Sequence, residues 1–148
     1  KVYDGSTAAT IATSSLTLTG LIAGDTVSIN TSSTTATFSD RNVANGKSVS
    51  LSATALTGAN ASNYSITLAG APTTTANITP KELTIAGSFT ASNKVYDGTT
   101  AATIASNNLT LTGLIAGDTV SINTSSTTAT FSDRNVANGK SVSLTAAP

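Results

Sequence analysis

Apolar and polar residues alternate along much of this chain with a period of two. The alternation is clearest at residues 15–19, 26–30, 47–53, 63–68 and 82–85. Such a pattern is typical of a β-strand with one buried and one solvated face. Thr, Val, Ile and Tyr, which recur in these segments, suit a pleated surface. No segment keeps the period of an α-helix, so we predict an all-β protein.

Turn-forming residues separate the predicted strands at intervals of roughly 8–12 residues. Asp4-Gly5 and Asn45-Gly46 are two examples, and Gly supplies the backbone conformations that tight turns need. Short strands at this spacing are typical of a small β-sandwich. An immunoglobulin-like and a β-grasp-like arrangement use similar strands, so the sequence leaves both open.

The same alternation predicts the hydrophobic core. In the first part of the chain and its junction with the second, the inward positions are Val2, Leu16, Leu18, Ile22, Val27, Ile29, Phe38, Val43, Val49, Leu51, Leu56, Tyr64, Ile66, Leu68, Ile78, Leu83 and Ile85. Aromatic residues make up only 4% of the chain, so we expect this core to be thin and mostly aliphatic.

The chain repeats itself with an offset of 93 residues. The Lys-Val-Tyr-Asp-Gly motif that starts at Lys1 returns at Lys94, and 48 of the 55 positions in residues 1–55 are identical in residues 94–148. This period exceeds the roughly 20–50 residues of a solenoid repeat and suits a small independent domain. We therefore predict tandem domains. Because the copies are nearly identical, each strand of one copy also fits the other, which favours strand exchange.

The repeated motif has a structural interpretation. Asp4 can accept hydrogen bonds from backbone N–H groups two or three residues later, and Gly5 can take the positive φ that closes a turn. Tyr3 can bury its ring and direct its hydroxyl to a backbone carbonyl. The alternative is an exposed tyrosine that recognises a partner. The equivalent residues of the second copy are Tyr96, Asp97 and Gly98.

Tyr64 follows a predicted turn at residues 58–60. Its position resembles the tyrosine corner of immunoglobulin-like sandwiches, in which a Tyr hydroxyl ties a strand to the turn that precedes it. We therefore expect Tyr64 to have a structural role.

Composition excludes several classes of chemistry. The chain of 148 residues contains no Cys, His, Met or Trp, and Lys+Arg and Asp+Glu are both 7. Without Cys or His there is no disulfide, no zinc site of the usual kind and no Ser/His or Cys/His nucleophile. Without net positive charge, neither nucleic acid nor an anionic membrane is an expected partner. No apolar run approaches the roughly 20 residues of a membrane-spanning helix.

The acidic residues offer only a limited case for a metal. Asp25, Asp40, Asp118 and Asp133 are the candidate calcium ligands, since they could converge with loop carbonyls. None of them belongs to an Asp-x-Asp-x-Asp-Gly calcium loop. The alternatives are a turn cap for Asp25 and a local ion pair or turn for Asp40 with Arg41. We expect no cofactor, and keep calcium as the alternative.

The chain resembles the YDG-type repeat domains of large bacterial surface and secreted adhesins. These are related to MBG domains and often occur in filamentous-haemagglutinin-like exoproteins. The resemblance implies an exported stalk of many repeats at the bacterial cell surface, and it implies no particular binding site. It rests on residues 1–10, 20–25, 37–47, 56–64, 75–85 and 94–140.

Pro80 marks the predicted boundary between domains. In this family Ile-Thr-Pro-Lys-x-Leu-Thr usually forms a junction, and residues 78–84 fit that pattern. Proline also cannot donate to the middle of a sheet. Residues 1–79 then form a first domain that lacks its opening strand, and residues 80–148 a second that lacks its closing strands. Either the parent chain continues on both sides or neighbouring chains supply the missing strands.

These observations favour a structural, non-enzymatic module in the stalk or fibre of an extracellular bacterial adhesin. Its expected partners are neighbouring repeats of the same chain or identical chains. One alternative is a filament subunit that donates β-strands between chains. Another is a module that binds a glycan or a host or matrix protein, for which the sequence marks no groove.

Overall fold

The computed structural model describes residues 1–12 and 14–145 and divides the chain into two compact units. The first unit is Lys1–Lys81 and the second is Glu82–Pro148. Both are built from antiparallel strands, with no α-helix among the described residues. The all-β prediction is therefore confirmed. Nor does this part of the chain contain a helix with the length and apolar character needed to span a membrane.

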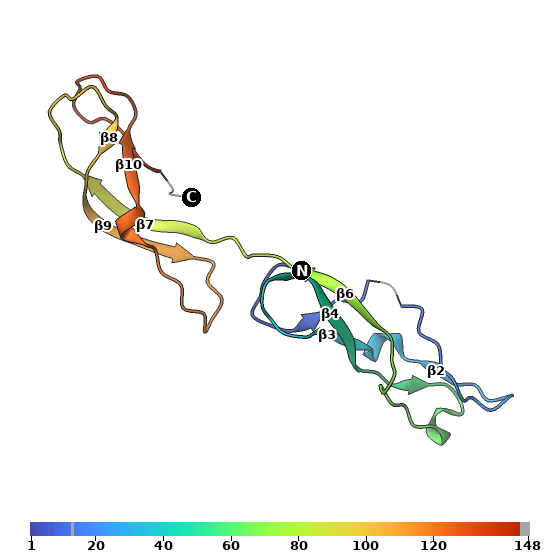
Figure 1. Cartoon of the computed structure of the whole chain (residues 1–148). Helices are drawn as coiled ribbons and strands as arrows, with labels where there is room; N and C mark the ends of the chain where they lie inside the picture. Colours follow the sequence, from blue (N-terminus) through green and yellow to red (C-terminus); the bar gives the residue numbers. More distant parts are fainter. Residues whose placement is uncertain (13, 146–148) are drawn as a thin grey trace. The chain divides into compact units, whose positions relative to one another are not determined.

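A four-stranded antiparallel sheet forms the centre of the first unit (Figure 1). Its order is β1 (Ala8–Ala9), β3 (Thr35–Phe38), β4 (Ala44–Ala53) and β6 (Thr73–Ile78). The long strand β4 pairs with β3 on one side and with β6 on the other. The prediction of a strand at residues 47–53 is confirmed within β4.

A second, smaller sheet completes the first unit. It joins β2 (Ser28–Ile29) to β5 (Leu56–Thr57), and 3₁₀ turns at Thr31–Ser33 (η1) and Ala61–Asn63 (η2) follow the two strands. The strand predicted at 26–30 is thus shorter than expected. The predictions for residues 15–19 and 63–68 are wrong. Residues 15–19 belong to no strand, and Asn63 ends η2 with no strand following before β6.

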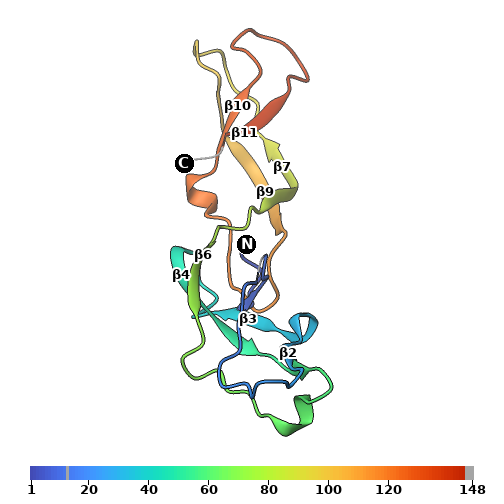
Figure 2. The same cartoon turned by 90° about the vertical axis from the view of Figure 1, so that its right-hand side faces the viewer.

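The second unit contains two sheets. In the first, β7 (Thr84–Ala91) pairs with β9 (Ile104–Thr112), and Figures 1 and 2 show these strands side by side. The other sheet has the order β11 (Val142–Thr145), β10 (Thr128–Phe131), β8 (Ala101–Ala102), and η3 (Thr124–Ser126) precedes β10. Part of the predicted strand at 82–85 lies in β7, which extends further than expected.

The hydrophobic core is smaller than the sequence suggested. In the first unit Ala36, Phe38, Val49 and Ile78 form the buried cluster, and Tyr3, Ala9, Ile11 and Leu51 pack against it. In the described part of the second unit only Ala129 is fully buried. Most other predicted core residues are half-buried, because each small sheet is covered by few side chains.

Four of the predicted core positions are exposed to solvent. These are Val2, Ile22, Val43 and Ile85. Val2 bridges to Thr79 just beyond β6, Val43 directly precedes β4, and Ile22 lies in the loop before β2. Ile85 lies on β7, whose sheet has only two strands. Alternation predicted which face these residues share but not whether another layer covers that face.

Candidate functional site formed by the repeated motif and the strand it holds

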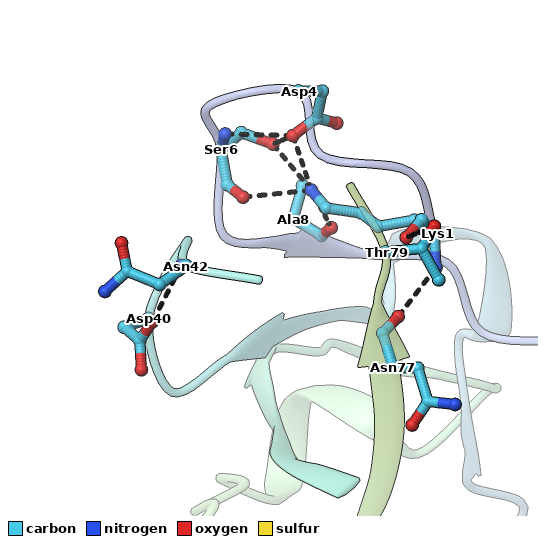
Figure 3. A network of polar contacts seen from close by, with 8 residues as sticks. All are labelled: Lys1, Asp4, Ser6, Ala8, Asp40, Asn42, Asn77 and Thr79. Carbon is cyan, nitrogen blue, oxygen red and sulfur yellow. Dashed lines mark hydrogen bonds and ion pairs between the residues drawn. The ribbon is translucent and has the colours of Figure 1, made fainter. Parts of the chain in front are cut away.

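The Lys1 ammonium group organises the loop that follows it (Figure 3). Lys1 Nζ donates to Asp4 Oδ1 at 2.7 Å, to Ser6 Oγ at 3.0 Å, and to the backbone oxygens of Ser6 and Ala8, both at 2.9 Å. Asp4 Oδ1 also accepts from the Ser6 amide at 2.9 Å. Gly5 closes the turn with a φ of 78°. Residues 4–8 thus wrap around one positive charge.

Charge strengthens this loop. Hydrogen bonding by the Lys1 side chain, followed by the Ser6 backbone amide, lowers the pKa of Asp4 to about 2. The carboxylate is therefore ionised at any ordinary pH. Lys1 Nζ also lies 5.8 Å from the centre of the Phe38 ring, within the range of a cation–π contact. Because Phe38 belongs to the core, the loop is anchored to the sheet.

The motif also holds the end of strand β6. The backbone nitrogen of Lys1 donates to the backbone oxygen of Asn77 at 2.8 Å, and the Thr79 amide donates to the backbone oxygen of Lys1 at 2.9 Å. The Tyr3 amide then donates to the Thr79 oxygen at 2.9 Å. Val2 and Thr79 form a parallel bridge. Residues 1–3 therefore run parallel to residues 77–79.

β6 is fixed from its other side as well. Ala44 pairs with Ile78, and the Gly46 amide donates to Asn77 Oδ1 at 2.8 Å. Ile78, only 1% exposed, packs into the core. The last residues of β6 thus lie between β4 and the N-terminal motif, and we call this arrangement the clamp, formed by residues 1–3 and 77–79.

A second ion pair closes the turn between β3 and β4. Lys47 Nζ donates to Asp40 Oδ2 at 2.6 Å, and the Asn42 amide donates to Asp40 Oδ1 at 2.7 Å. These bonds, that from Lys47 first, lower the pKa of Asp40. Of the two alternatives expected for Asp40 with Arg41, the local turn forms through the Asn42 amide, whereas the ion-pair partner of Asp40 is Lys47 across the turn and not Arg41. Asp133 and Lys140 form the equivalent pair in the second unit.

The second copy of the motif folds in the same way. Lys94 Nζ donates to Asp97 Oδ1 at 2.7 Å and to two oxygens of Thr99 at 2.9 Å. The pKa of Asp97 falls to about 2 for the same causes as that of Asp4, with Lys94 first. Lys94 Nζ lies 5.8 Å from the centre of the Phe131 ring. The loop is therefore a property of the repeat rather than of one copy.

The second copy differs in having no strand beside its motif among the described residues. A hollow of about 670 Å³ lies there, lined by Val95, Tyr96, Phe131 and Val142 among others. Tyr96 is 58% exposed, whereas Tyr3 is half-buried. Val95, Phe131 and Val142 correspond to Val2, Phe38 and Val49, which lie beside β6 or the residue that follows it in the first unit.

Tyr64 forms a separate polar link within the first unit. Its hydroxyl donates to Asp25 Oδ2 at 2.6 Å and accepts from the Ile22 amide at 3.1 Å. The hydrogen bond to Asp25 raises the pKa of Tyr64. Tyr64 therefore reaches the loop before β2, which is distant in sequence, and not the turn just ahead of it.

The candidate calcium ligands do not come together. Within the described residues, no group of three or more acidic side chains gathers at one place. Asp25 is bonded to Tyr64, while Asp40 and Asp133 are paired with lysines. Asp118 lies in a turn, where its amide donates to the Ile115 oxygen. The carboxylates of Asp25, Asp40 and Asp133 thus hold loops in place.

The structure also assigns roles that the sequence interpretation missed. Lys1 and Asn77 are central to the clamp, although neither was a candidate. The recurrence of Lys at the same position of both motifs was the available signal for Lys1. Pro80 is exposed and follows the clamp directly, outside β6.

Comparison with known proteins identifies the repeat. A family model described as the YDG domain matches residues 1–76 and again residues 79–147. The two matches together span nearly the whole chain, and each contains one copy of the motif. No curated protein and no solved structure matches the chain.

Proposed function

We propose that this chain is a non-enzymatic repeat region that carries mechanical tension in an exported protein. The chain belongs to the YDG domain family and matches its model twice in tandem. The finer proposal is a stalk or fibre of a bacterial surface adhesin, in which such repeats project a binding region or build an extracellular layer. Neighbouring repeats are then the natural partners of each unit.

The clamp is the observation that carries this proposal. Residues 1–3 enter the first unit parallel to residues 77–79, which leave it, and three backbone hydrogen bonds join them. A force that pulls on Lys1 and on the chain beyond Thr79 slides these segments past one another. The three bonds are then loaded together rather than one after another, which is the stronger arrangement for bearing tension.

Composition agrees with an extracellular fibre. Only 9% of residues are charged, there is no Cys, and 51 of 148 residues are Thr or Ser. A chain without Cys is insensitive to the redox change that accompanies export. Some strand hydroxyls contact each other across a sheet, as do those of Thr35 and Ser52 at 3.0 Å.

Stretching single molecules that contain the whole chain tests the proposal. Thr79→Pro removes the amide that donates to Lys1, one of three clamp bonds, so the unfolding force of the first unit should fall by roughly a third. Thr79→Ala keeps that amide and is the matched control. An unchanged force in Thr79→Pro would show that the clamp bears no load.

A filament that assembles by strand donation between chains is the second candidate. The hollow beside Tyr96 favours it, since a β6-type strand of another molecule would fit there. This candidate predicts oligomers whose mass rises with concentration. Sedimentation of the intact chain distinguishes the two, because a stalk repeat remains monomeric.

A further inference from the structure

One segment of the repeat adopts different structures in the two units. Residues 11–19 and Ile104–Thr112 are identical at six of nine positions. In the second unit the segment is β9, which pairs with β7 along its length. In the described part of the first unit, residues 14–19 belong to no strand. Sequence differences do not explain this, since residues 16–19 are identical to their counterparts.

The contacts between β7 and β9 show what the segment needs as a partner. Ile85 lies opposite Leu111, and Gly87 lies opposite Leu109. On the other face, the hydroxyls of Thr90 and Ser106 are 2.6 Å apart. These contacts extend over the whole of β7, so register is well specified.

Gly87 makes this pairing selective. Its φ is +91°, and a Cβ atom at this position would lie 2.2 Å from the backbone oxygen of Asn108. Real Cβ atoms do not approach a backbone oxygen so closely, so the two backbones pass each other only because residue 87 has no side chain. Alanine at this position provides a specific way to prevent the pairing.

In the first unit, described residues of this segment line two grooves. Two grooves of about 320 and 370 Å³ are both lined by Leu16 and Leu51. The larger also contains Ile11, and the smaller contains Leu18. These leucines are half-buried. Apolar side chains that line grooves and a backbone without strand pairing thus occur together in residues 14–19, as at a site for strand addition.

We propose that residues 14–19 are an acceptor for a β7-type strand, supplied by another copy of segment 81–93 joined directly before Lys1. Asn93 precedes Lys94, and Lys94 corresponds to Lys1. A segment added there therefore reaches the acceptor through a connection of the length already used in the second unit. The register of β7 and β9 then places its Ile85 equivalent opposite Leu18 and its Gly87 equivalent opposite Leu16.

A β7 strand from a separate molecule is a less favourable partner for this segment than one joined before Lys1. The β7 strand of another chain is already paired with its own β9. Moving it to residues 14–19 replaces one ladder with a similar one, and association also costs translational and rotational entropy. A preceding copy of the segment has no other acceptor, so its pairing adds a ladder without breaking one.

Hydrogen exchange on an extended chain tests the proposal. The sequence of residues 81–93 is added ahead of Lys1, and amide exchange is followed at residues 14–19 by NMR. We expect protection at the paired amides to rise by about tenfold or more. The matched control carries Ala at the added glycine that corresponds to Gly87, and there protection should stay at the level of the original chain.

Two results would overturn the proposal. One is equal protection in the glycine and alanine extensions, and the other is no gain with either. If the extended chain does not fold, the same segment is added to the original chain as a free peptide, with the alanine peptide as control. NMR chemical shifts near residues 14–19 that change with the glycine peptide but not with the alanine peptide would support the proposed acceptor. Unchanged chemical shifts with the glycine peptide would contradict it. Exchange reports strand pairing independently of the unfolding force.

Discussion

The two copies of the repeat are nearly identical in sequence yet differ in which of their strands are paired. In the first unit β4 (Ala44–Ala53) has neighbours on both sides. In the second, its counterpart is reduced to β11 (Val142–Thr145), and residues 137–141 form no strand. The reverse holds for β9, because residues 14–19, the described part of the first unit that corresponds to Asn107–Thr112, form no strand. A segment of this repeat is therefore a strand only where a partner lies beside it.

The same difference governs burial. Phe38 is 5% exposed and packs with Ile78 of β6. Phe131, its counterpart, is only half-buried, because no β6-type strand lies beside it among the described residues. Identical side chains thus contribute different amounts to stability in the two units, and the difference can be measured.

The largest expected effect comes from the two phenylalanines. Phe38→Ala should reduce the free energy of unfolding of the first unit by about 3–5 kcal/mol, as for other buried phenylalanines. Phe131→Ala should cost the second unit roughly half as much, since its ring is already partly solvated. Denaturant unfolding followed by NMR resolves the two units. Equal losses would contradict the structural difference between the copies.

Gly87→Ala should have the next largest effect, and only on the second unit. The added Cβ would meet the Asn108 oxygen, so pairing of β7 with β9 should be lost at a cost of about 2–3 kcal/mol. Gly117→Ala is the control, because it has a similar positive φ but no atom within 4 Å of its Cβ position. It should cost about 1–2 kcal/mol from backbone strain alone. If the two variants are equally destabilised, the close approach at Gly87 is not important.

Tyr64→Phe tests a contact between the repeated 55 residues and a side chain outside them. It removes the hydroxyl that joins Asp25 to the Ile22 amide and should reduce the stability of the first unit by about 1 kcal/mol. Thermal unfolding is the measurement. Asp25→Asn keeps an acceptor for the hydroxyl and should cost less. A larger loss in Asp25→Asn would assign the carboxylate another role.

The smallest expected effect is shared by both copies. The pKa values of Asp4 and Asp97 are about 2 in the folded chain, below the ordinary value of 3.8. Folding therefore favours the ionised form, and this stabilisation is present above pH 4 and is lost as the pH falls towards 2. Asp4→Asn combined with Asp97→Asn should flatten the acid limb of the stability curve. An unchanged acid limb would mean that neither loop contributes.

Local sequence predicts a structural feature well when the interactions that form the feature join residues close together in the chain. Asp4 and Gly5 form their turn in both copies because a carboxylate, a nearby amide and a residue without Cβ are sufficient for it. Strand β4 agrees with its alternating pattern. By contrast, Val2 and Val43 fit a core pattern but are exposed, and Ala36 is buried although nothing about an alanine indicated this. Burial depends on the neighbouring layer.

The sequence by itself determined that this chain is an all-β tandem repeat of 93 residues with a charged turn at the start of each copy, because alternation, turn chemistry and repetition are properties of short segments. Only the tertiary structure decided that Lys1 and Asn77 meet in the clamp, that Asp40 pairs with Lys47, and which copy of each strand is paired. A strand is stabilised by hydrogen bonds to a distant segment, so its own residues cannot specify whether that segment is present.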